Sequence, residues 1–279
     1  MTGRSPRDPT RTEEVVRLWR CSNDDLPYGM AVTLASEWLD DRERASVKRF
    51  VFDHDRRQYS VAHAMLRRVL ALETGVPESG LEFGRTARGR PFLREPEGGW
   101  PRGAGGIDFN LSHCRGTNAL AVVRHRRVGV DVERCDRRDF DLDRLVGAFT
   151  TEERGWISAM PDPAERARAG LRLWTLKEAY AKARGLGLGL PFDSFAFHLA
   201  PGRGVLGFVP PDDDRDGVWG FAELTSGRRT LLALAVECAH TPVTGVRVSD
   251  GFPWRPHASL ESLCPEPDAP VHLVGAPDS

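Results

Sequence analysis

The stretch RAGLRLWTLKEAYAKARGLGLG, residues 168–189, predicts a long helix that ends in a run of glycines. The helix is expected over about 168–184, because glycine is typical of the position just past a helix C-terminus. A second long helix is predicted over about 56–74, where Gly75 supplies the same stop signal. Strand-like sequence follows each helix, which is typical of an α+β fold.

The two helices belong to a faint internal repeat. The glycine after each helix and the phenylalanine of the next strand recur at an offset of 112 residues, and a later strand recurs at nearly that offset. The matching pairs are Gly75 with Gly187, Phe83 with Phe195, and strand 120–123 with strand 232–235. We therefore expect two similar α+β halves related by a pseudo-twofold axis, with a site in the cleft between them. Coincidence among helix–glycine–strand units is the alternative.

The repeat and the local composition divide the chain into four parts. Residues 1–14 are polar and contain proline, so we expect a disordered tail. The N-terminal half is expected to cover 15–125 and the C-terminal half 126–245, with the site residues of GVDVE and the second helix in the latter. Residues 246–279 are rich in Pro, Asp and Gly, which predicts a loosely packed extension.

Composition excludes several classes of protein. The chain has 279 residues, with 39 Lys and Arg against 40 Asp and Glu. This near-neutral balance argues against a nucleic-acid binder, which normally carries a clear basic excess. No run approaches eighteen apolar residues, and the first residues contain no apolar segment, so we expect neither a membrane helix nor a secretory signal. Five scattered cysteines without a CxxC pair favour a reducing cytoplasm.

The sharpest chemical signal is GVDVE, residues 129–133. Asp131 and Glu133 are two apart in a strand-like run, so their side chains project to one face, while the valines between them face a core. Two carboxylates on one face repel each other unless a cation lies between them, and oxygen ligands suit Mg²⁺ or Mn²⁺. A strand end with a solvated acidic face is the alternative.

The second signal lies on the helix of 168–184. Trp174, Glu178 and Lys182 are spaced four apart, so they share one stripe of the helix. The stripe places a third carboxylate and a cation within reach of the acidic pair, and the glycines of 185–189 let the chain turn closely around a ligand or a neighbour. A surface salt bridge on a helix with a flexible end is the alternative.

Two further segments offer groups that bind anions. FNLSH, residues 109–113, provides Asn110, Ser112 and His113 as hydrogen-bond donors to a phosphate, although a lone His near a strand end is more often structural. RTARGRP, residues 85–91, provides three arginines, a hydroxyl and a glycine. In a chain this rich in arginine, the second segment is weak evidence alone.

Taken together and in this order, these segments resemble the Sfp-type 4′-phosphopantetheinyl transferases. The matching text is RTARGRP (85–91), FNLSH (109–113), GVDVE (129–133) and LWTLKEAYAKARGLGL (173–188), and 49–70 is similar to the family's first long helix. The resemblance covers about residues 45–200. It implies the family's α+β fold, in which longer members form a monomeric pseudo-dimer of two halves. The length favours the broad type that serves polyketide or non-ribosomal peptide biosynthesis.

The resemblance implies a defined reaction. The family moves the phosphopantetheine arm of coenzyme A onto a serine of an acyl or peptidyl carrier protein and releases adenosine 3′,5′-bisphosphate. The resemblance assigns Mg²⁺, or alternatively Mn²⁺, to Asp131, Glu133 and Glu178, where the ion stabilises the leaving phosphate. Lys182 would neutralise the same charge, and Glu178 or a metal-bound water would be the base. Glu153 stands where the family often has another acidic catalytic residue.

The resemblance also implies the contacts of coenzyme A. Its nucleotide would be lined by Arg85, Thr86, Arg88 and Arg90, and its phosphates would meet Asn110, Ser112, His113 and Lys182, with His113 at the 3′-phosphate. One departure concerns the nucleotide phosphate. Many relatives have a basic residue four positions before the Phe that matches Phe50, whereas this chain has Ser46 there, with Arg44 or Lys48 as candidate substitutes.

A carrier protein is the implied partner, and neither a nucleic acid nor a membrane is expected. The family's carriers are typically acidic on their recognition helix, which makes Arg137, Arg138 and Arg144 candidate contacts. A solvated arginine surface explains them equally well. Two other functions stay open: a catalytically silent relative that binds coenzyme A or a carrier protein, and another Mg²⁺-dependent nuclease or nucleotide hydrolase. The acidic residues with Lys182 argue against the first, and FNLSH with the helix stripe argues against the second.

Overall fold

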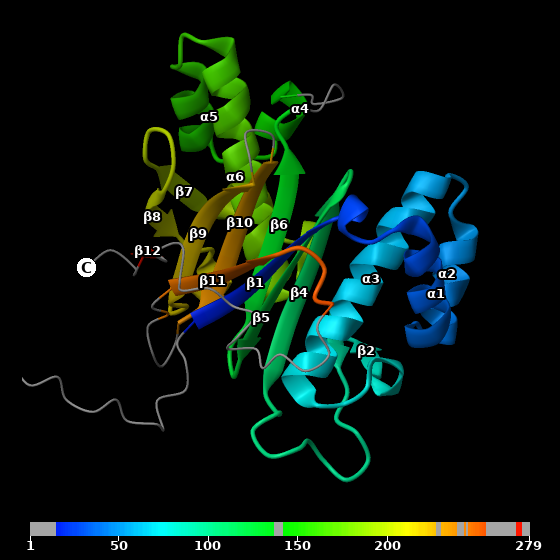
Figure 1. The fold of residues 1–279 in the computed structure, drawn as a ribbon. Coiled ribbons are helices and arrows are strands. Elements are labelled where there is room, and N and C mark those ends of the chain that lie inside the picture. The colour runs from blue at the N-terminus through cyan, green and yellow to red at the C-terminus, as the bar shows by residue number, and fades with distance from the viewer. Residues whose placement is uncertain are drawn as a thin grey trace, which may run out of the picture.

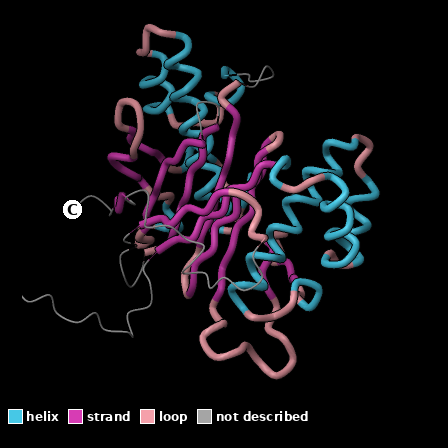
Figure 2. The backbone as a smooth tube through the Cα atoms, in the orientation of Figure 1, coloured by secondary structure: helices cyan, strands magenta, loops and turns pink. Residues whose placement is uncertain are grey.

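The computed structural model describes residues 15–136, 142–226, 230–238, 243, 245–254 and 272–274. They form two units with the same order of elements: a strand, short helices, a 22-residue helix, a hairpin and two long strands (Figures 1 and 2). The prediction of an α+β fold with two similar halves is therefore confirmed.

The first unit contains β1 (Val15–Ser22), α1 (Tyr28–Trp38), α2 (Asp41–Arg49), α3 (Asp53–Thr74), β2 (Phe83–Arg85), β3 (Pro91–Leu93), β4 (Ile107–Cys114) and β5 (Thr117–Arg124). The second contains β6 (Val128–Arg134), α4 (Leu142–Val146), α5 (Thr151–Ser158), α6 (Pro163–Arg184), β7 (Ala196–Leu199), β8 (Val205–Val209), β9 (Trp219–Ser226) and β10 (Thr230–Glu237). Two later strands follow, β11 (Gly245–Asp250) and β12 (His272–Val274).

The sheets have matching topologies. One sheet has the order β11-β1-β5-β4 and the other the order β12-β9-β10-β6. In each unit the first strand pairs antiparallel with the last, β1 with β5 and β6 with β10, and the last pairs with the strand before it. The pseudo-twofold relation follows from this pattern, since each element of one unit has a counterpart in the other.

The offset between the units is not constant. Helices α3 and α6 end at Gly75 and Gly185, which both adopt the left-handed conformation that closes a helix (φ 74° and 69°). The counterpart of Gly75 is thus Gly185, and the predicted match with Gly187 was wrong by two residues. The loops after the two helices differ in length. The offset therefore increases from 110 residues at Gly75 and Gly185 to 113 at the last strands, which begin at Thr117 and Thr230.

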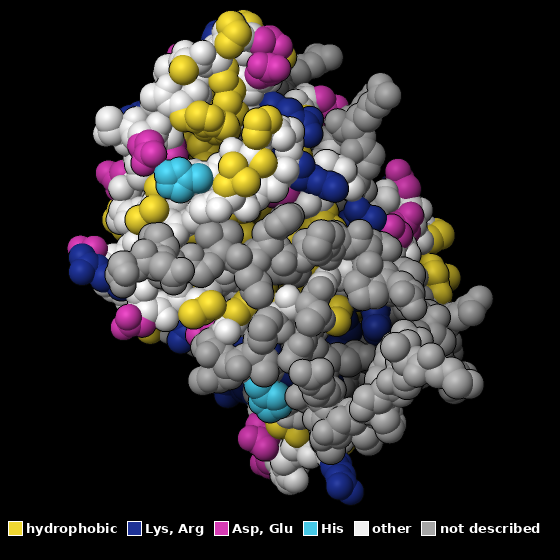
Figure 3. Space-filling view, turned by 90° about the vertical axis from the view of Figure 1, so that its left-hand side faces the viewer, with side chains coloured by type: hydrophobic (Ala, Val, Ile, Leu, Met, Phe, Trp, Pro, Cys, Tyr) yellow, Lys and Arg dark blue, Asp and Glu magenta, His cyan; other side chains and the backbone are white. Residues whose placement is uncertain are grey.

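The core consists of three clusters of buried side chains, one between the two sheets and one between each sheet and its long helix. The two sheets pack face to face through Val, Leu and Ala side chains of β1, β5, β6, β9, β10 and β11. Helix α3 covers the outer face of the first sheet and α6 the outer face of the second, so that the helices lie on opposite sides in Figure 1. The surface turned to the viewer in Figure 3 carries acidic and basic side chains close together, in keeping with the near-neutral charge.

The C-terminal extension needs a correction. Strand β11 lies parallel to β1, and Phe252 is buried against the core between α3 and the first sheet. The backbone oxygen of Pro253 accepts a hydrogen bond of 3.1 Å from Arg68 Nε of α3. Residues 245–254 are therefore an integral part of the first unit, and the prediction of a loosely packed extension over 246–279 was wrong for residues 246–254. The predicted tail 1–14 lies outside the described residues.

The packing of Phe252 gives a stability prediction. Replacing this buried ring by alanine leaves a cavity, so we expect Phe252→Ala to lower the free energy of unfolding by about 3 kcal/mol in urea denaturation. Leu206→Ala is the control, because Leu206 is 69% exposed and should cost little. Equal midpoints for the Phe252 variant and the wild type would show that residues 245–254 are not part of the core.

Candidate functional site

The candidate site forms where β6 lies against α6. Gly129, Asp131 and Glu133 share the face of β6 that is turned to the helix. A Cβ atom at Gly129 would overlap the carbonyl oxygen of Ala179 and lie 2.5 Å from the amide nitrogen of Ala183. Because glycine has no side chain, the helix backbone approaches the strand closely at this point. Gly129 thereby brings the stripe of α6 within reach of the acidic residues, a role that the sequence motif did not reveal.

Asp131 is the centre of the site. Its side chain is buried, and its Oδ1 accepts hydrogen bonds from Ser112 Oγ at 2.9 Å and from Lys182 Nζ at 2.6 Å. Lys182 Nζ also lies 3.1 Å from Ser112 Oγ. The second oxygen, Oδ2, is buried and has no hydrogen-bond partner within the described part of the chain. A buried carboxylate oxygen without a partner is costly, so this atom is suited to a ligand.

Glu178 shares the electrostatics of this site. Its pKa is raised to about 7: burial is the main cause, the positive charge of Lys182 opposes it, and the negative charges of Asp131 and Glu133 add to it. The three carboxylates predicted to act together therefore influence one another, as does the lysine of the same helix stripe. The first residue of the stripe, Trp174, has a different role: it packs on the core and against the ring of Phe192, with ring centroids 5.4 Å apart.

The residues fit a divalent cation by their chemistry. Carboxylate oxygens are the ligands that Mg²⁺ prefers, and the unpaired Oδ2 of Asp131 offers one directly. Across the described ranges, no three His, Cys, Asp or Glu side chains are grouped closely enough to hold a metal ion as they stand. The ammonium group of Lys182 instead compensates the charge of Asp131. The assignment of Asp131, Glu133 and Glu178 as metal ligands stays a prediction.

The raised pKa of Glu178 predicts how stability depends on pH without metal. Between pH 4.5 and about 7, the folded protein retains a proton on Glu178 that the unfolded chain has lost, so stability falls as pH rises through this window. We expect wild type in EDTA to lose roughly 1–3 kcal/mol relative to Glu178→Gln across the window, measured by urea denaturation. Parallel stability curves for the two proteins would contradict the raised pKa.

The catalytic role predicted for Glu153 is not supported. Glu153 is 3% exposed, and its Oε2 accepts hydrogen bonds from the backbone and hydroxyl of Thr150 in a capping box at the start of α5. Its Oε1 accepts from the backbone N–H of Phe197, and Lys177 Nζ lies 2.9 Å from Oε2. Both oxygens are bonded to structural partners, so Glu153 connects α5, α6 and β7.

Lys177 completes this buried structural pair. Its ammonium group donates to the carbonyl oxygens of Phe192 and Phe195 at 2.7 and 2.6 Å and lies 4.3 Å from the ring centre of Phe195. Burial lowers its pKa to about 8, which Glu153 opposes. The two lysines of this helix therefore differ: Lys177 faces the core and Lys182 faces the site.

A substitution separates the structural from the catalytic role of Glu153. Glu153→Gln leaves Lys177 buried without its counter-charge, so we expect the free energy of unfolding to fall by about 3 kcal/mol. The folded fraction should retain the wild-type kcat at low temperature. The neighbouring exposed Glu152→Gln is the matched control. A large loss of kcat with an unchanged melting temperature would restore the catalytic role.

The FNLSH segment forms part of β4, beside β6. Asn110 Oδ1 accepts a 2.9 Å hydrogen bond from the backbone N–H of Val130, so this side chain joins the two strands. Ser112 is buried and contacts Asp131 and Lys182, as described above. His113 is exposed at the edge of a pocket of about 500 Å³, together with Phe50, Tyr59, His54, Arg57 and Arg115. Although His113 is in contact with solvent, the surrounding side chains partly desolvate it and lower its pKa; the charges of His63 and Lys182 lower this pKa further, and those of Asp131 and Asp55 oppose them.

The arginine segment forms the turn of the β2–β3 hairpin. Arg85, Thr86 and Arg88 are exposed, which suits the predicted contact with a nucleotide. Arg88 Nη1 lies against the turn after α6, where a Cβ atom added at Gly189 would be 3.2 Å away from it. The glycine run therefore makes room for a neighbour, one of the two roles predicted for it. Arg90 is different, because its guanidinium group is turned into the protein and bonded to protein oxygens.

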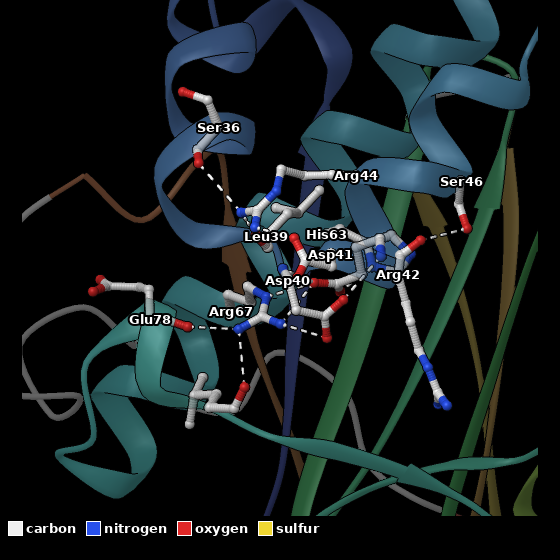
Figure 4. A network of polar contacts seen from close by, with 12 residues as sticks. Ser36, Leu39, Asp40, Asp41, Arg42, Arg44, Ser46, His63, Arg67 and Glu78 are labelled. Carbon is white, nitrogen blue, oxygen red and sulfur yellow. Dashed lines mark hydrogen bonds and ion pairs between the residues drawn. The ribbon is translucent and has the colours of Figure 1, made fainter.

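A basic residue that the sequence analysis did not name lies beside Ser46. Arg49 Nη2 donates a 3.0 Å hydrogen bond to Ser46 Oγ, so an exposed arginine lies beside the serine. Arg44 bonds the backbone oxygens of Leu39 and Ser36 and pairs with Asp41 at 2.7 Å (Figure 4). Of the two candidate substitutes, Arg44 is therefore occupied, and Lys48 is exposed. A spacing of about one helical turn from Ser46 is the signal in the sequence that could have identified Arg49.

The α2–α3 contact that carries Ser46 is held by a buried ionic network (Figure 4). Arg67 of α3 is fully buried and bonds Glu43, Asp40 and the backbone oxygens of Glu78 and Leu81. Glu43 Oε1 lies 2.7 Å from His63 Nδ1. The network fixes α2 on α3.

Of the predicted carrier contacts, Arg144 is exposed on α4, whereas Arg137 and Arg138 lie outside the described residues.

Comparison with known proteins gives two family matches that together span both units. Residues 127–224 match the 4′-phosphopantetheinyl transferase superfamily, and residues 19–124 match the model described as 4′-phosphopantetheinyl transferase, N-terminal. The chain is 31% identical over 220 residues to the 4′-phosphopantetheinyl transferase HetI of Nostoc sp., covering 75% of this chain and 89% of HetI.

Other similar proteins have related descriptions. The L-aminoadipate-semialdehyde dehydrogenase-phosphopantetheinyl transferase of Xenopus laevis is 27% identical over 232 residues, covering 77% of this chain and 76% of that protein. Among solved structures, a holo-(acyl-carrier-protein) synthase from Bacillus anthracis is 18% identical, covers 40% of this chain and 94% of its own, and has a TM-score of 0.34. Within the described residues, no helix has the length and hydropathy needed to cross a bilayer.

Proposed function

The chain belongs to the 4′-phosphopantetheinyl transferase superfamily, and on that premise we propose how its β6–α6 site carries out the transfer. The protein is an enzyme that transfers the phosphopantetheine arm of coenzyme A to a serine of a carrier protein. The observation that carries the residue assignment is the buried Asp131, with one oxygen bonded to Lys182 and Ser112 and the other without a described partner.

In the proposed reaction, the serine Oγ of the carrier bonds to the phosphorus that bears the pantetheine arm. The pyrophosphate P–O bond breaks, and adenosine 3′,5′-bisphosphate leaves with the electron pair. Asp131, Glu133 and Glu178 would hold Mg²⁺, which supplies positive charge to the pyrophosphate when bound. Lys182, whose Nζ lies 2.6 Å from Asp131, would bring its ammonium charge to the same phosphates.

Glu178 is the proposed acceptor of the serine proton. A base works best when its pKa is near the operating pH, and burial brings the pKa of Glu178 to about 7. This value applies to the site without a metal, and bound Mg²⁺ would favour the ionised carboxylate, which is the form that takes a proton. A silent binder is not favoured, because the acidic residues and Lys182 are all present in one site.

We further propose that coenzyme A binds across both units. Its nucleotide would lie along Arg85, Thr86 and Arg88, with Arg49 beside Ser46 supplying the basic group missing at that position. Its phosphates would meet Ser112 and His113 on the way to Lys182. Because one chain contains both halves, a monomer is sufficient to complete this site.

Release of adenosine 3′,5′-bisphosphate tests the reaction. The protein is incubated with coenzyme A, Mg²⁺ and an apo carrier protein, and the nucleotide is measured by chromatography. We expect release that depends on the carrier, is absent with a carrier whose acceptor serine is replaced by alanine, and stops in EDTA. Release that does not require the carrier serine would contradict the transfer, and full activity in EDTA would contradict the metal.

A further inference from the structure

Arg90 has contacts that the nucleotide role predicted for it does not explain. It follows the turn of the β2–β3 hairpin, and its side chain is only 12% exposed. One terminal nitrogen, Nη1, donates to the backbone oxygen of Lys182. The other, Nη2, donates to Asp108 Oδ2 at 2.6 Å and to the backbone oxygens of Val128 and Phe109 at 2.8 and 3.3 Å. Both terminal nitrogens are thus bonded to the protein.

These contacts join the two units at the site. Asp108 and Phe109 belong to β4 of the first unit, whereas Val128 begins β6 and Lys182 lies in the last turn of α6. Asp108 Oδ2 also accepts a 2.8 Å hydrogen bond from the backbone N–H of Val128. Arg90 and Asp108 therefore form one joint that connects a strand of the first unit to the two elements that carry Asp131 and Lys182.

Arg90 contacts the last turn of α6, the turn that carries Lys182. A guanidinium group at the C-terminus of a helix satisfies a carbonyl oxygen and complements the helix dipole. Gly185 leaves room for it, since a Cβ there would lie 3.1 Å from Arg90 Cδ. The carbonyl that Arg90 binds belongs to Lys182 itself, whose Nζ reaches Asp131. A shift of the last turn of α6 would therefore move the lysine relative to the carboxylate.

We propose that Arg90 is a positioning residue for the transfer reaction, holding Lys182 and β6 in register across the two units, and is not a contact of coenzyme A. The inference rests on the proposed function for its kinetic test. Arginine suits this role and lysine does not, because only the planar guanidinium can donate to several oxygens in fixed directions. A phosphate contact, in contrast, would be served by either cation.

Substitutions of Arg90 distinguish the two roles. For Arg90→Lys and Arg90→Ala we expect kcat to fall about 10- to 100-fold, with the Kd of coenzyme A, measured by calorimetry, unchanged within about twofold. Arg94→Ala is the matched control, since it removes an exposed arginine from the same hairpin. An active Arg90→Lys together with a weakened Kd in Arg90→Ala would overturn the proposal and assign Arg90 to the phosphate.

A double-mutant cycle with Asp108→Ala tests the joint. If the two residues act as one unit, the double variant should have the same kcat as either single variant, whereas independent effects would multiply. Multiplying effects would contradict a shared joint.

Hydrogen exchange gives a readout that does not depend on activity. The backbone N–H of Val128 donates to Asp108, so we expect it to exchange faster in the Arg90 and Asp108 variants than in wild type or Arg94→Ala. If wild type modifies no carrier protein, the proposed function fails while the exchange result still tests the joint. If wild type is active and Val128 exchanges equally in all variants, the joint fails and the proposed function stands.

Discussion

Asp131→Asn is expected to abolish carrier modification, with a loss of kcat on the order of 10²–10³-fold or more. The substitution keeps the shape of the side chain and its hydrogen bond with Ser112, so the fold should be retained. It removes the negative charge that pairs with Lys182 and, with the amide oxygen kept at the Oδ1 position, puts an NH2 group that cannot bind a cation in place of Oδ2. The measurement is initial-rate kinetics with a saturating carrier protein.

The matched control is Asp136→Asn, on the turn directly after β6, which also removes one negative charge. Asp136 is exposed and pairs with Arg134 at the surface, so we expect near wild-type kcat. Wild-type kcat in Asp131→Asn would remove Asp131 from the mechanism. A similar loss in both variants would show that net charge, rather than this carboxylate, determines the rate.

Lys182→Met is expected to slow transfer about 100-fold while coenzyme A still binds. The variant keeps the length of the side chain but removes the ammonium group beside Asp131 and Ser112. Because Lys182 lowers the pKa of Glu178, its removal should raise that pKa and shift the acid limb of the kcat profile to higher pH. Kinetics from pH 6 to 9, with coenzyme A affinity from calorimetry, measure both effects.

Arg168→Ala is the control for the loss of a positive charge on the same helix. Arg168 is exposed and lies almost four helical turns from Lys182. We expect it to keep the wild-type kcat and pH profile. An unchanged kcat in Lys182→Met would exclude the lysine from catalysis. A slower reaction with an unshifted pH profile would show that Lys182 acts on the phosphates without tuning Glu178.

The sequence predicted those parts of the site that depend on local periodicity. Asp131 and Glu133 share a strand face, and Glu178 and Lys182 share a helix stripe, so spacing alone placed each pair. The glycines after the two long helices identified the repeat, although the exact match was Gly185 rather than Gly187. Helix and strand periods are properties of the local chain, which is why they could be read without a structure.

The features that the sequence did not reveal depend on contacts distant in the sequence. Glu153 has a helix-cap role, which its spacing from Thr150 shows, but its pairing with Lys177 requires the packing of α5 on α6. Arg90 stands in a basic loop like its neighbours, yet its acceptors come from β4, β6 and α6. Phe252 lies within the segment 246–279, which is rich in Pro, Asp and Gly, and only the pairing of β11 with β1 brings it into the core.

The intact mass of an apo carrier protein tests the central claim most directly. Wild type and Asp131→Asn are incubated in parallel with coenzyme A and Mg²⁺, and the carrier is then weighed by mass spectrometry. We expect a gain of one phosphopantetheine per carrier with wild type and no gain with Asp131→Asn. A gain of the same size and rate with Asp131→Asn, or none with wild type on acyl and peptidyl carriers alike, would contradict it.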